Sequence, residues 1–443
     1  MIVMKFGGSS VANSERIRNV ADIVKKHLDR RPVLVLSAMG DTTDHLLEAG
    51  DKALKRGQIL TGKIEELHLN TIEELDLGDK TLRDADLLLD ELRKLLIGIS
   101  LIRELTPRTK DYLVSFGERL SARIVSAYFN TQGIYSMALD SWDAGIVTDS
   151  NFGSAELSQD SWDLIPEKVI APAEEGQLQV ITGYIAKDEH GNITTLGRGG
   201  SDLTATMIAS CCGAEEVQVW KDVDGVLTAD PRIVENTKPV ETISFEAAAE
   251  LAYFGAQVLH PRAMQPCMRT GTPALVKNSY NPEAPGTRIV ASQEGETPLV
   301  QTISFKKNET LVDIVSSRML GQHGFLAEVF SCFTRHGLSV DMVATSEVSV
   351  SLTLNENYDL AAIRKDLSLI ASVEIKTGKA IVTIVGDVNR SSEILARSFR
   401  VCEDMGVQVQ MISQGASKVN ISFIVDDKEA PEVVKGLHKD FFE

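Results

Sequence analysis

The residues best suited to chemistry lie in glycine-rich segments that also carry a fixed charge. The first segment, MKFGGSS, places Lys5 two residues before the pair Gly7 and Gly8, directly after a short apolar run. A Gly-Gly turn lets the backbone approach a ligand closely, and its N–H groups can point at an anion beside the lysine. A strand that ends in a surface turn would have the same composition. This segment alone leaves both interpretations open.

Two further segments have similar chemistry. GRGGSD joins Arg198 to Asp202 through a flexible turn at the expected start of a helix. Backbone N–H groups and the helix dipole there favour a bound anion, although a helix cap would explain the same residues. WKDVDGVLTADPR (220–232) concentrates three acids around a glycine turn after a predicted strand. That composition suits the edge of a nucleotide and its metal, and it equally suits a surface loop.

Several classes of protein are excluded by composition and by missing motifs. A formal net charge of −18 over 443 residues argues against a nucleic-acid-binding surface or a polybasic membrane patch, because both need clustered Lys and Arg. Asp202 stands where the G-x-G-x-x-G fingerprint needs its third glycine, and nothing matches G-x-x-x-x-G-K-S/T. Neither a Rossmann dehydrogenase nor a P-loop enzyme is indicated.

The cysteines and the apolar runs bear on the compartment. The five cysteines are odd in number and show no C-x-x-C spacing, so we expect neither a disulfide framework nor a zinc site. No basic region leads into an apolar run near the first residues, and no run approaches about 18 apolar residues. We therefore expect no signal peptide, no membrane span and a cytoplasmic protein.

A βαβ unit is the expected scaffold for the first glycine turn. Residues 13–30 place apolar side chains on one helical face, and RPVLVLSAMG (31–40) predicts a buried strand. This order of elements favours a parallel sheet with right-handed crossovers. Residues 44–128 predict a helical layer, and 178–186 and 216–220 predict further strands on either side of a helix. We expect one α/β domain up to about residue 295.

The C-terminal third contains an internal repeat. Residues 278–296 have the Pro, Gly and polar composition of a linker. Residues 312–354 and 382–425 then share the order strand, loop, helix ending in Gly, strand, turn and strand, with a period of about 70 residues. Two small βαββαβ units are expected. The strand-to-helix loops of such units make clefts for small ligands.

Seven features in order resemble the aspartate kinases of the amino acid kinase family. They are KFGGSS, VLVLSAMGDTTD, SFGERLSA, TTLGRGGSDLTA, DVDGVLTADPR, FGAQVLHP and the paired C-terminal units. The resemblance covers essentially the whole chain. It implies a carbamate-kinase-like α/β sandwich with a mainly parallel central sheet over residues 1–295, followed by two ferredoxin-like βαββαβ ACT domains over 305–377 and 378–443.

The resemblance also implies a reaction. Aspartate kinases transfer the γ-phosphoryl group of ATP to the β-carboxylate of L-aspartate, which gives 4-phospho-L-aspartate and ADP. This reaction is the first step towards lysine, threonine and methionine. Mg²⁺ would bridge the ATP phosphates, and no residue of this chain is assigned to it as a ligand. A homodimer or homotetramer through the ACT domains is expected.

The matching motifs carry roles for individual residues. Lys5 would contact the β- and γ-phosphates, with Asp202 holding it in place. Arg198 would bind the α-carboxylate of aspartate and Glu118 its α-ammonium group. The other matches to the aspartate pocket are Ser37, Thr43, Gly199, Gly200 and Ser201, and those to the nucleotide site are Gly7, Gly8, Ser9, Lys221, Asp222, Asp224, Leu227, Asp230, Pro231, Arg232 and Gln257.

Two departures from the family pattern weaken parts of this assignment. Gln257 stands where many family members have lysine, so one expected cation near the phosphates is missing. Leu227 replaces an aromatic residue that is often found there, which affects how the adenine would pack. Lys221 could replace the missing charge, or it could be a solvated lysine at a strand end. Without the family match, Glu118 would be taken for an exposed helical glutamate.

The first repeat resembles the effector site of lysine-inhibited aspartate kinases. MLGQHGFLAEVF (319–330) offers backbone groups before a helix, and Asp341 on the following strand offers an anion for a bound ammonium group. The same segments could instead pair strands in a dimer interface. The matching positions are Met319, Gly324, Phe325, Leu326, Ser339, Val340, Asp341, Thr345, Ser346 and Glu347.

Two other functions remain open at this point. Another amino acid kinase would act on glutamate, acetylglutamate or UMP, but the long helical segment and the C-terminal repeat argue against the short members of that family. A ligand-sensing protein with an inactive kinase domain is the second alternative. Gln257 favours it, whereas Lys5, Arg198 and Asp202 are all retained.

Overall fold

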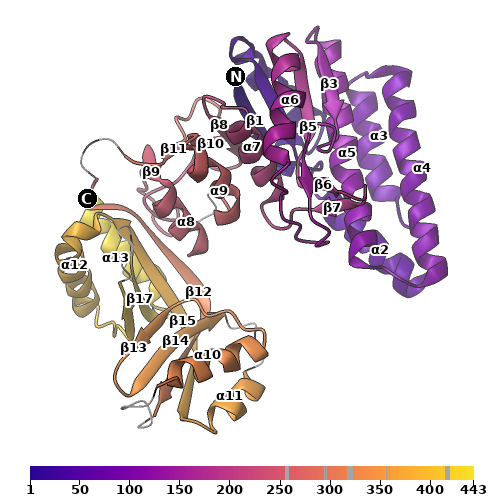
Figure 1. Cartoon of the computed structure of the whole chain (residues 1–443). Helices are drawn as coiled ribbons and strands as arrows, with labels where there is room; N and C mark the ends of the chain where they lie inside the picture. The colour runs from indigo at the N-terminus through magenta and orange to yellow at the C-terminus, as the bar shows by residue number, and fades with distance from the viewer. Residues whose placement is uncertain are drawn as a thin grey trace. The chain divides into compact units, whose positions relative to one another are not determined.

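The computed structural model describes residues 1–254, 259–293, 295, 297–316, 323–355, 358, 360–414 and 420–443. The chain divides into two compact units (Figure 1). The first unit comprises Met1–Val226, Glu241–Ala249 and Val258–Ser292, and the second comprises Leu227–Val240, Glu250–Gln257 and Gln293–Glu443. Among the described helices, none combines the length and the apolar composition that a membrane crossing requires.

An eight-stranded sheet forms the centre of the first unit, with the strand order β3-β5-β2-β1-β8-β10-β11-β9. All of its paired strands are parallel except β10 and β11. The central strands β1 and β2 are buried along their whole length, as their apolar runs predicted. The strands are β1 Ile2–Phe6, β2 Pro32–Leu36, β3 Ser136–Leu139, β5 Leu178–Thr182, β8 Val217–Lys221, β9 Thr242–Ser244, β10 Ala274–Asn278 and β11 Thr287–Val290.

Helices cover this sheet. The predicted helical layer over 44–128 consists of α2 Thr42–Arg56, α3 Gly62–Glu74, α4 Gly78–Ile102 and α5 Pro107–Thr131. One apolar core joins β1 and β2 to α4 and α5 through Phe6, Leu36, Leu92 and Phe116. The other helices are α1 Ser14–Lys25, α6 Ser161–Glu174, α7 Gly200–Cys211, α8 Phe245–Tyr253 and α9 Pro261–Thr270, and a small sheet holds β4 Val147–Thr148, β6 Ile185–Asp188 and β7 Ile193–Thr195.

Local chemistry explains where two of these helices begin. The side chain of Asn13 accepts a hydrogen bond from the backbone N–H of Arg16, so the predicted cap of α1 lies at Asn13. Thr106 accepts a bond from the N–H of Thr109, and Pro107 follows it in the first turn of α5. Thr106 and Pro107 thus fix the start of α5, the helix that carries Glu118.

The second unit is built on a six-stranded antiparallel sheet in the order β13-β14-β12-β15-β17-β16. The two sequence repeats share this sheet, because the long strands β12 Val300–Val315 and β15 Ser372–Gly386 run through both of them. The remaining elements are β13 Val343–Thr345, β14 Ser349–Asn355, β16 Met411–Ser413, β17 Asn420–Asp426, α10 Phe325–Arg335, α11 Ala361–Leu367, α12 Ser391–Asp404 and α13 Ala430–Phe442.

Each repeat has its own apolar core, but the segments that build it differ from the expected domain ranges. Val312 and Ile314 lie in the core of the first repeat, whereas Val300 and Ile303, from the start of the same strand, lie in the core of the second. The second core therefore begins before the expected start of the first ACT domain at residue 305. The first repeat is inserted between the parts of the second.

Residues 227–240 also differ from the expected 1–295 domain, because they belong to the second unit. Val234 packs in the core of the second repeat. The backbone N–H of Ile303 donates to the carbonyl of Thr228 at 2.9 Å, and the hydroxyl of Thr228 bonds to Nε2 of His438 at 2.9 Å. Backbone pairing and apolar burial together hold this segment on the second unit.

Candidate active site

A cavity of about 330 Å³ brings together both expected catalytic residues and every residue expected to bind aspartate. Its walls come from the ends of β1 and β2, from α5, and from the glycine turn that precedes α7. Ligands of parallel α/β sheets bind at such carboxyl ends of strands. The lining residues are Lys5, Ser37, Thr43, Glu118, Tyr184, Gly197, Arg198, Gly199, Gly200, Ser201 and Asp202.

A buried charge cluster occupies one end of this cavity. The ammonium group of Lys5 lies 2.7 Å from Oδ1 of Asp202, and that of Lys221 lies 3.7 Å from Oδ2 of the same carboxylate. β1 and β8 are neighbouring strands, and Asp202 lies in the first turn of α7. Burial would raise the pKa of Asp202, but the two ammonium groups lower it below its ordinary value. The cluster thus groups two cations around one carboxylate, with Lys5 and Asp202 buried and Lys221 partly exposed.

Glu118 lies on α5 and is fully enclosed, contrary to what a helical glutamate in this sequence context would suggest. Burial raises its pKa to about 8. Its Oε1 accepts a hydrogen bond from the backbone N–H of Ala38 at 3.3 Å, and its Oε2 has no hydrogen-bond partner among the described residues. An enclosed carboxyl group with an unpaired oxygen is suited to receive a cationic group from a ligand.

Two glycines allow the backbone to approach closely around the cavity. A Cβ atom on Gly8 would lie 2.8 Å from the carbonyl oxygen of Ala38, so a side chain there would collide with the turn after β2. Gly199 has a φ of 73°, and a Cβ there would lie 2.6 Å from the Cβ of His260. The turn that carries Arg198 therefore depends on glycine for both its conformation and its packing.

The remaining expected aspartate-site residues differ in exposure. The hydroxyl of Ser37 donates to that of Ser201 at 3.0 Å, which ties the turn after β2 to the start of α7. Thr43 lines the cavity from the first turn of α2. Arg198 is exposed, and no ion pair of its guanidinium is found within the described ranges. Its charge is thus available to a ligand.

Sequence reasoning missed two residues at this site. Tyr184 lines the cavity with a φ of 67°, and burial raises its pKa. His260 packs against the glycine turn, where burial and then the neighbouring Arg198 and Arg262 lower its pKa. FGAQVLHP contains His260 but gave it no role. In ITGYIA, Tyr184 follows a glycine at the end of a predicted strand, and this combination is the signal that could have suggested it.

The expected nucleotide residues are divided between the two units. In the first unit, Oδ1 of Asp224 accepts bonds from the amides of Asn278 at 2.8 Å and Asn281 at 3.2 Å, and Asp222 is exposed at the end of β8. The carbonyl of Ser9 accepts a bond from the Tyr280 hydroxyl. Leu227, Asp230, Pro231 and Arg232 lie in the second unit, and Gln257 lies outside the described residues.

The expected effector residues lie around α10 and β13 of the second unit. Gly324 precedes α10 with a φ of 91°, and Phe325 and Val340 pack in one apolar core. Leu326, Ser339, Thr345, Ser346 and Glu347 are exposed, and Met319 lies outside the described residues.

Asp341 is already paired within the chain. Its Oδ1 accepts a hydrogen bond from the hydroxyl of Tyr253 at 2.5 Å, and its Oδ2 pairs with the ammonium group of Lys306 at 2.5 Å. Lys306 also lies 2.9 Å from the buried carboxylate of Glu309. We call Asp341, Lys306, Glu309 and Tyr253 the Asp341 cluster. Burial would lower the pKa of Lys306, but its two carboxylate partners raise it overall.

Comparison with known proteins agrees with this architecture. Residues 1–278 match the model of the amino acid kinase family, and residues 312–365 and 382–441 match an ACT domain model. The chain is 48% identical to aspartokinase 1, chloroplastic, of Arabidopsis thaliana, an alignment that covers 100% of this chain and 80% of that protein. It is 34% identical to lysine-sensitive aspartokinase 3 of Escherichia coli (strain K12), covering 100% and 99%.

Solved structures give the same result. The structure of E. coli aspartokinase III in complex with lysine and aspartate matches with a TM-score of 0.84 at 33% identity, and 100% of each chain is covered. The same enzyme in complex with aspartate and ADP gives the same values. The predicted fold class is confirmed by these matches. Because the likeness extends over the whole chain and both family models match in the predicted order, this chain belongs to the aspartokinases of the amino acid kinase family.

Proposed function

We propose that this chain transfers the γ-phosphoryl group of ATP to the β-carboxylate of L-aspartate. The observation that carries the proposal is the cavity that places the Lys5, Asp202 and Lys221 cluster together with Glu118 and Arg198. An unperturbed aspartate side chain has a pKa of about 3.9, so the acceptor is already an anion at neutral pH and needs no general base. The protein's task is to bring two anions together.

The charges of the cavity suit that task. Phosphoryl transfer passes through a loose transition state, and positioning and electrostatic stabilisation supply most of the catalysis. In our proposal Lys5 contacts the β- and γ-phosphates and Lys221 adds a second cation, which compensates for the glutamine at position 257. Asp202 keeps both ammonium groups in place. The Gly7-Gly8 turn lets the backbone approach the phosphates.

Recognition of the amino acid would rely on two other groups. Arg198 takes the α-carboxylate, and Glu118 takes the α-ammonium group with its unpaired Oε2. Binding an ammonium group would lower the raised pKa of Glu118, so aspartate would bind with loss of a proton from this carboxyl group. This pair would distinguish an amino acid from a simple dicarboxylate.

Mg²⁺ fits this cavity as a partner of ATP rather than of the protein. The carboxyl groups that line the cavity are those of Glu118 and Asp202. Asp202 is paired with two ammonium groups, and burial raises the pKa of Glu118 to about 8, which disfavours its charged form. The phosphates themselves would thus be the principal ligands. When bound, Mg²⁺ would neutralise the charge of the phosphates.

ADP release with L-aspartate as the sole acceptor tests the reaction. We expect turnover with aspartate and ATP, and trapping of the acyl phosphate by hydroxylamine as a hydroxamate. Folded protein that releases ADP only with glutamate, acetylglutamate or UMP would be a different amino acid kinase. Folded protein that gives no hydroxamate but binds free amino acids would be a ligand sensor with an inactive kinase domain.

We propose further that lysine inhibits the enzyme by binding at the first repeat. Two observations support this: Phe325 at the start of α10 and Val340, the neighbour of Asp341 in sequence, belong to one apolar core, and a similar protein is named lysine-sensitive. Inhibition requires lysine to bind the less active conformation more tightly. Asp341→Asn should raise the lysine concentration for half-inhibition at least 10-fold, since a charge-assisted bond contributes about 1.5–3 kcal/mol. An enzyme inhibited by threonine but not by millimolar lysine would refute the assignment.

A role in lysine biosynthesis and a homodimer or homotetramer through the ACT domains complete the proposal. β13 and β16 are the edge strands of the six-stranded sheet, and an exposed edge can pair with another copy. Sedimentation analysis with and without lysine tests the assembly. A cytoplasmic location stays a prediction from the sequence, and fractionation of the source cells tests it.

A further inference from the structure

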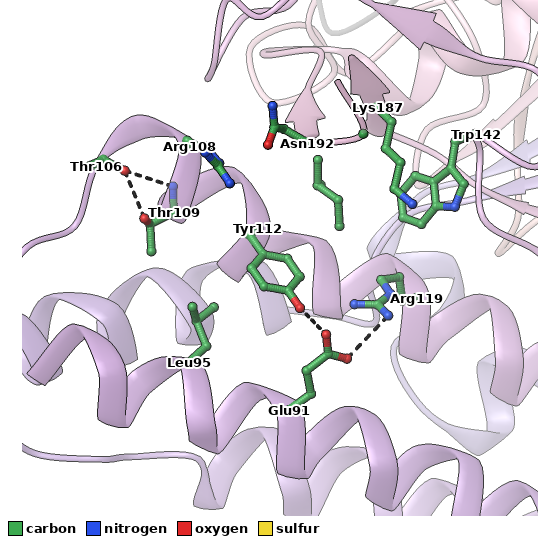
Figure 2. Close-up of a pocket in the computed structure, with 12 residues that line it drawn as sticks. Glu91, Leu95, Thr106, Arg108, Thr109, Tyr112, Arg119, Trp142, Lys187 and Asn192 are labelled. Atoms are coloured by element: carbon green, nitrogen blue, oxygen red, sulfur yellow. Dashed lines mark hydrogen bonds and ion pairs between the residues drawn. The ribbon is translucent and has the colours of Figure 1, made fainter. Parts of the chain in front are cut away.

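A second and larger cavity of the first unit, about 520 Å³, lies between α4, the N-terminal half of α5 and the turn between β6 and β7 (Figure 2). None of its residues belongs to the proposed aspartate or nucleotide sites. Its lining consists of Glu91, Leu95, Thr106, Arg108, Thr109, Tyr112, Arg119, Trp142, Lys187, Gly191, Asn192 and Ile193.

The lining of this cavity is positively charged, although the chain as a whole carries a net charge of −18. Arg108, Arg119 and Lys187 face one acid, Glu91. Two further acids lie near the lining: Asp140 is held bidentately by Arg123 at 2.9 and 3.1 Å, and Asp143 interacts electrostatically with Lys187. A concave surface with an excess of cations concentrates small anions.

Two hydrogen-bond donors of Arg119 have no partner among the described residues. Its Nη2 lies 3.5 Å from Glu91 Oε2, and its Nε lies 3.9 Å from Asp140 Oδ2, which is beyond hydrogen-bond distance. Nε and Nη1 are buried and have no hydrogen-bond partner in the described part of the chain. Leaving buried donors unpaired is costly, and the planar guanidinium fork matches a carboxylate or phosphate group. The guanidinium group of Arg119 therefore has unused hydrogen-bonding capacity beside the cavity.

The rest of the cavity suits a flat or apolar body. The ammonium group of Lys187 lies 4.1 Å from the centre of the Trp142 ring, and Figure 2 shows both side chains on the wall that faces Tyr112. Leu95 adds an aliphatic surface, and the Tyr112 hydroxyl is taken up by Glu91. Such a combination of apolar walls and a few fixed polar groups is typical of sites for small organic ligands.

We propose that this cavity binds a small organic anion, whose carboxylate or phosphate group pairs with Arg119 and Lys187 and whose apolar body lies against Trp142. The cavity shares α5 with the aspartate pocket, because Arg119 follows Glu118 directly. Asp111, also on α5, accepts bonds from Thr195 N and Oγ1 at 2.9 Å and so holds β7, which leads into the Arg198 turn. A ligand here would contact a helix that the substrate also uses.

Calorimetric titration of the full chain tests the site. Phenyl phosphate and benzoate present the two anionic groups on the same ring, and inorganic phosphate lacks the ring. ADP, Mg²⁺ and L-aspartate are kept saturating, so that the kinase site is occupied, and the Lys5→Ala chain is titrated in parallel. We expect one additional site for phenyl phosphate or benzoate, with the tighter of the two identifying the preferred anionic group, and weaker binding of inorganic phosphate.

The variants locate the site. Arg119→Gln and, independently, Lys187→Gln should each weaken binding about 10-fold or more, because each removes a charge-assisted bond. Lys80→Gln is the matched control: it removes one exposed cation from α4, roughly 16 Å along the helix from Glu91, and should leave affinity unchanged. If Arg119→Gln fails to fold, as judged by circular dichroism, Lys187→Gln alone decides. No binding at millimolar probe, binding unchanged in a folded Lys187→Gln chain, or tighter binding of inorganic phosphate than of phenyl phosphate would overturn the proposal.

Discussion

The kinase cavity and the Asp341 cluster both gather buried charges, but they leave different groups available. In the kinase cavity Asp202 forms ion pairs with two ammonium groups, while one oxygen of Glu118 has no hydrogen-bond partner among the described residues. In the Asp341 cluster both oxygens of the expected effector-binding acid are taken, by Tyr253 and Lys306. The first site is preorganised for a ligand. In the Asp341 cluster, Asp341 must give up its contact with Tyr253 or Lys306 before it can bind a ligand.

The difference follows from the scaffolds. Lys5 and Lys221 lie on neighbouring buried strands, and Asp202 lies in the first turn of a buried helix, so their positions are fixed by packing. The expected effector residues lie on short edge elements and exposed turns. Preorganised charges favour catalysis, whereas exchangeable pairs suit an equilibrium that an effector shifts.

The largest effect is expected where preorganised charge is removed. Lys5→Ala and Asp202→Asn should each lower kcat about 100- to 1,000-fold, because both groups act on the transferring charge. The double variant should lose less than the product of the two, since the groups form one pair. Steady-state kinetics on chains with native circular dichroism measures this, with the exposed Lys26→Ala as control. Near-native activity in either variant contradicts the assignment.

Lys5 and Arg198 could be predicted from the sequence because their glycine-rich motifs lie at the end of a strand and before a helix. Glu118, in the middle of α5, was expected here only from the family resemblance, and the structure lines one cavity with all three. The enclosure of Glu118 was not predictable, because helical periodicity does not tell which partner covers a face. Tyr184 was missed because ITGYIA, in which it follows a glycine, is not one of the motifs that carry the resemblance.

The second unit was harder to predict for a different reason. A repeat in sequence suggests independent domains, yet β12 and β15 are long enough to serve both cores. The placement of residues 227–240 depends on tertiary contacts of Thr228 and Val234 that local patterns do not encode. The pairing of Asp341 with Lys306 likewise joins a residue that precedes β13 to a residue within β12.

Arg198→Ala should change substrate affinity more than turnover. The exposed guanidinium has no ion pair in the described part of the chain, and a bond between charged groups contributes about 1.5–3 kcal/mol, so KM for aspartate should rise roughly 10- to 100-fold. KM for ATP should change little. Initial rates over a matrix of both substrates separate the two constants. Equal increases in both would move Arg198 to the phosphates.

Glu118 should give the aspartate affinity a distinctive pH dependence. Burial raises its pKa to about 8, and the proposed contact with an ammonium group needs the ionised form. The value of kcat/KM for aspartate should therefore fall about 10-fold for each pH unit below 8, and Glu118→Gln should be weaker throughout but flatter. A wild-type profile that is flat between pH 6 and 8 would exclude this role.

The same carboxyl group should also affect stability. Because its folded pKa is raised, the stabilisation from the neutral form is fully present below its ordinary pKa of 4.5 and is lost as pH rises through about 8. Glu118→Gln replaces the carboxyl group with an amide that does not ionise, so the variant does not lose this stability as the pH rises. The difference in Tm between the variant and the wild type should therefore shift in favour of the variant from pH 5 to pH 9, as differential scanning calorimetry would measure. A constant difference would place the ionisation elsewhere.

The smallest effect concerns the exchangeable pair. Tyr253 holds Oδ1 of Asp341, and an incoming ammonium group must share or displace that bond. Tyr253→Phe removes the hydroxyl but keeps the ring, so lysine should inhibit at a concentration about 2- to 10-fold lower, which corresponds to one neutral hydrogen bond of about 0.5–1.5 kcal/mol. Tyr135→Phe, the same change at an exposed tyrosine of the first unit, is the control. If the half-inhibitory concentration rises instead, Tyr253 orients Asp341 towards the effector, and the Asp341 cluster is preorganised in the same way as the kinase cavity.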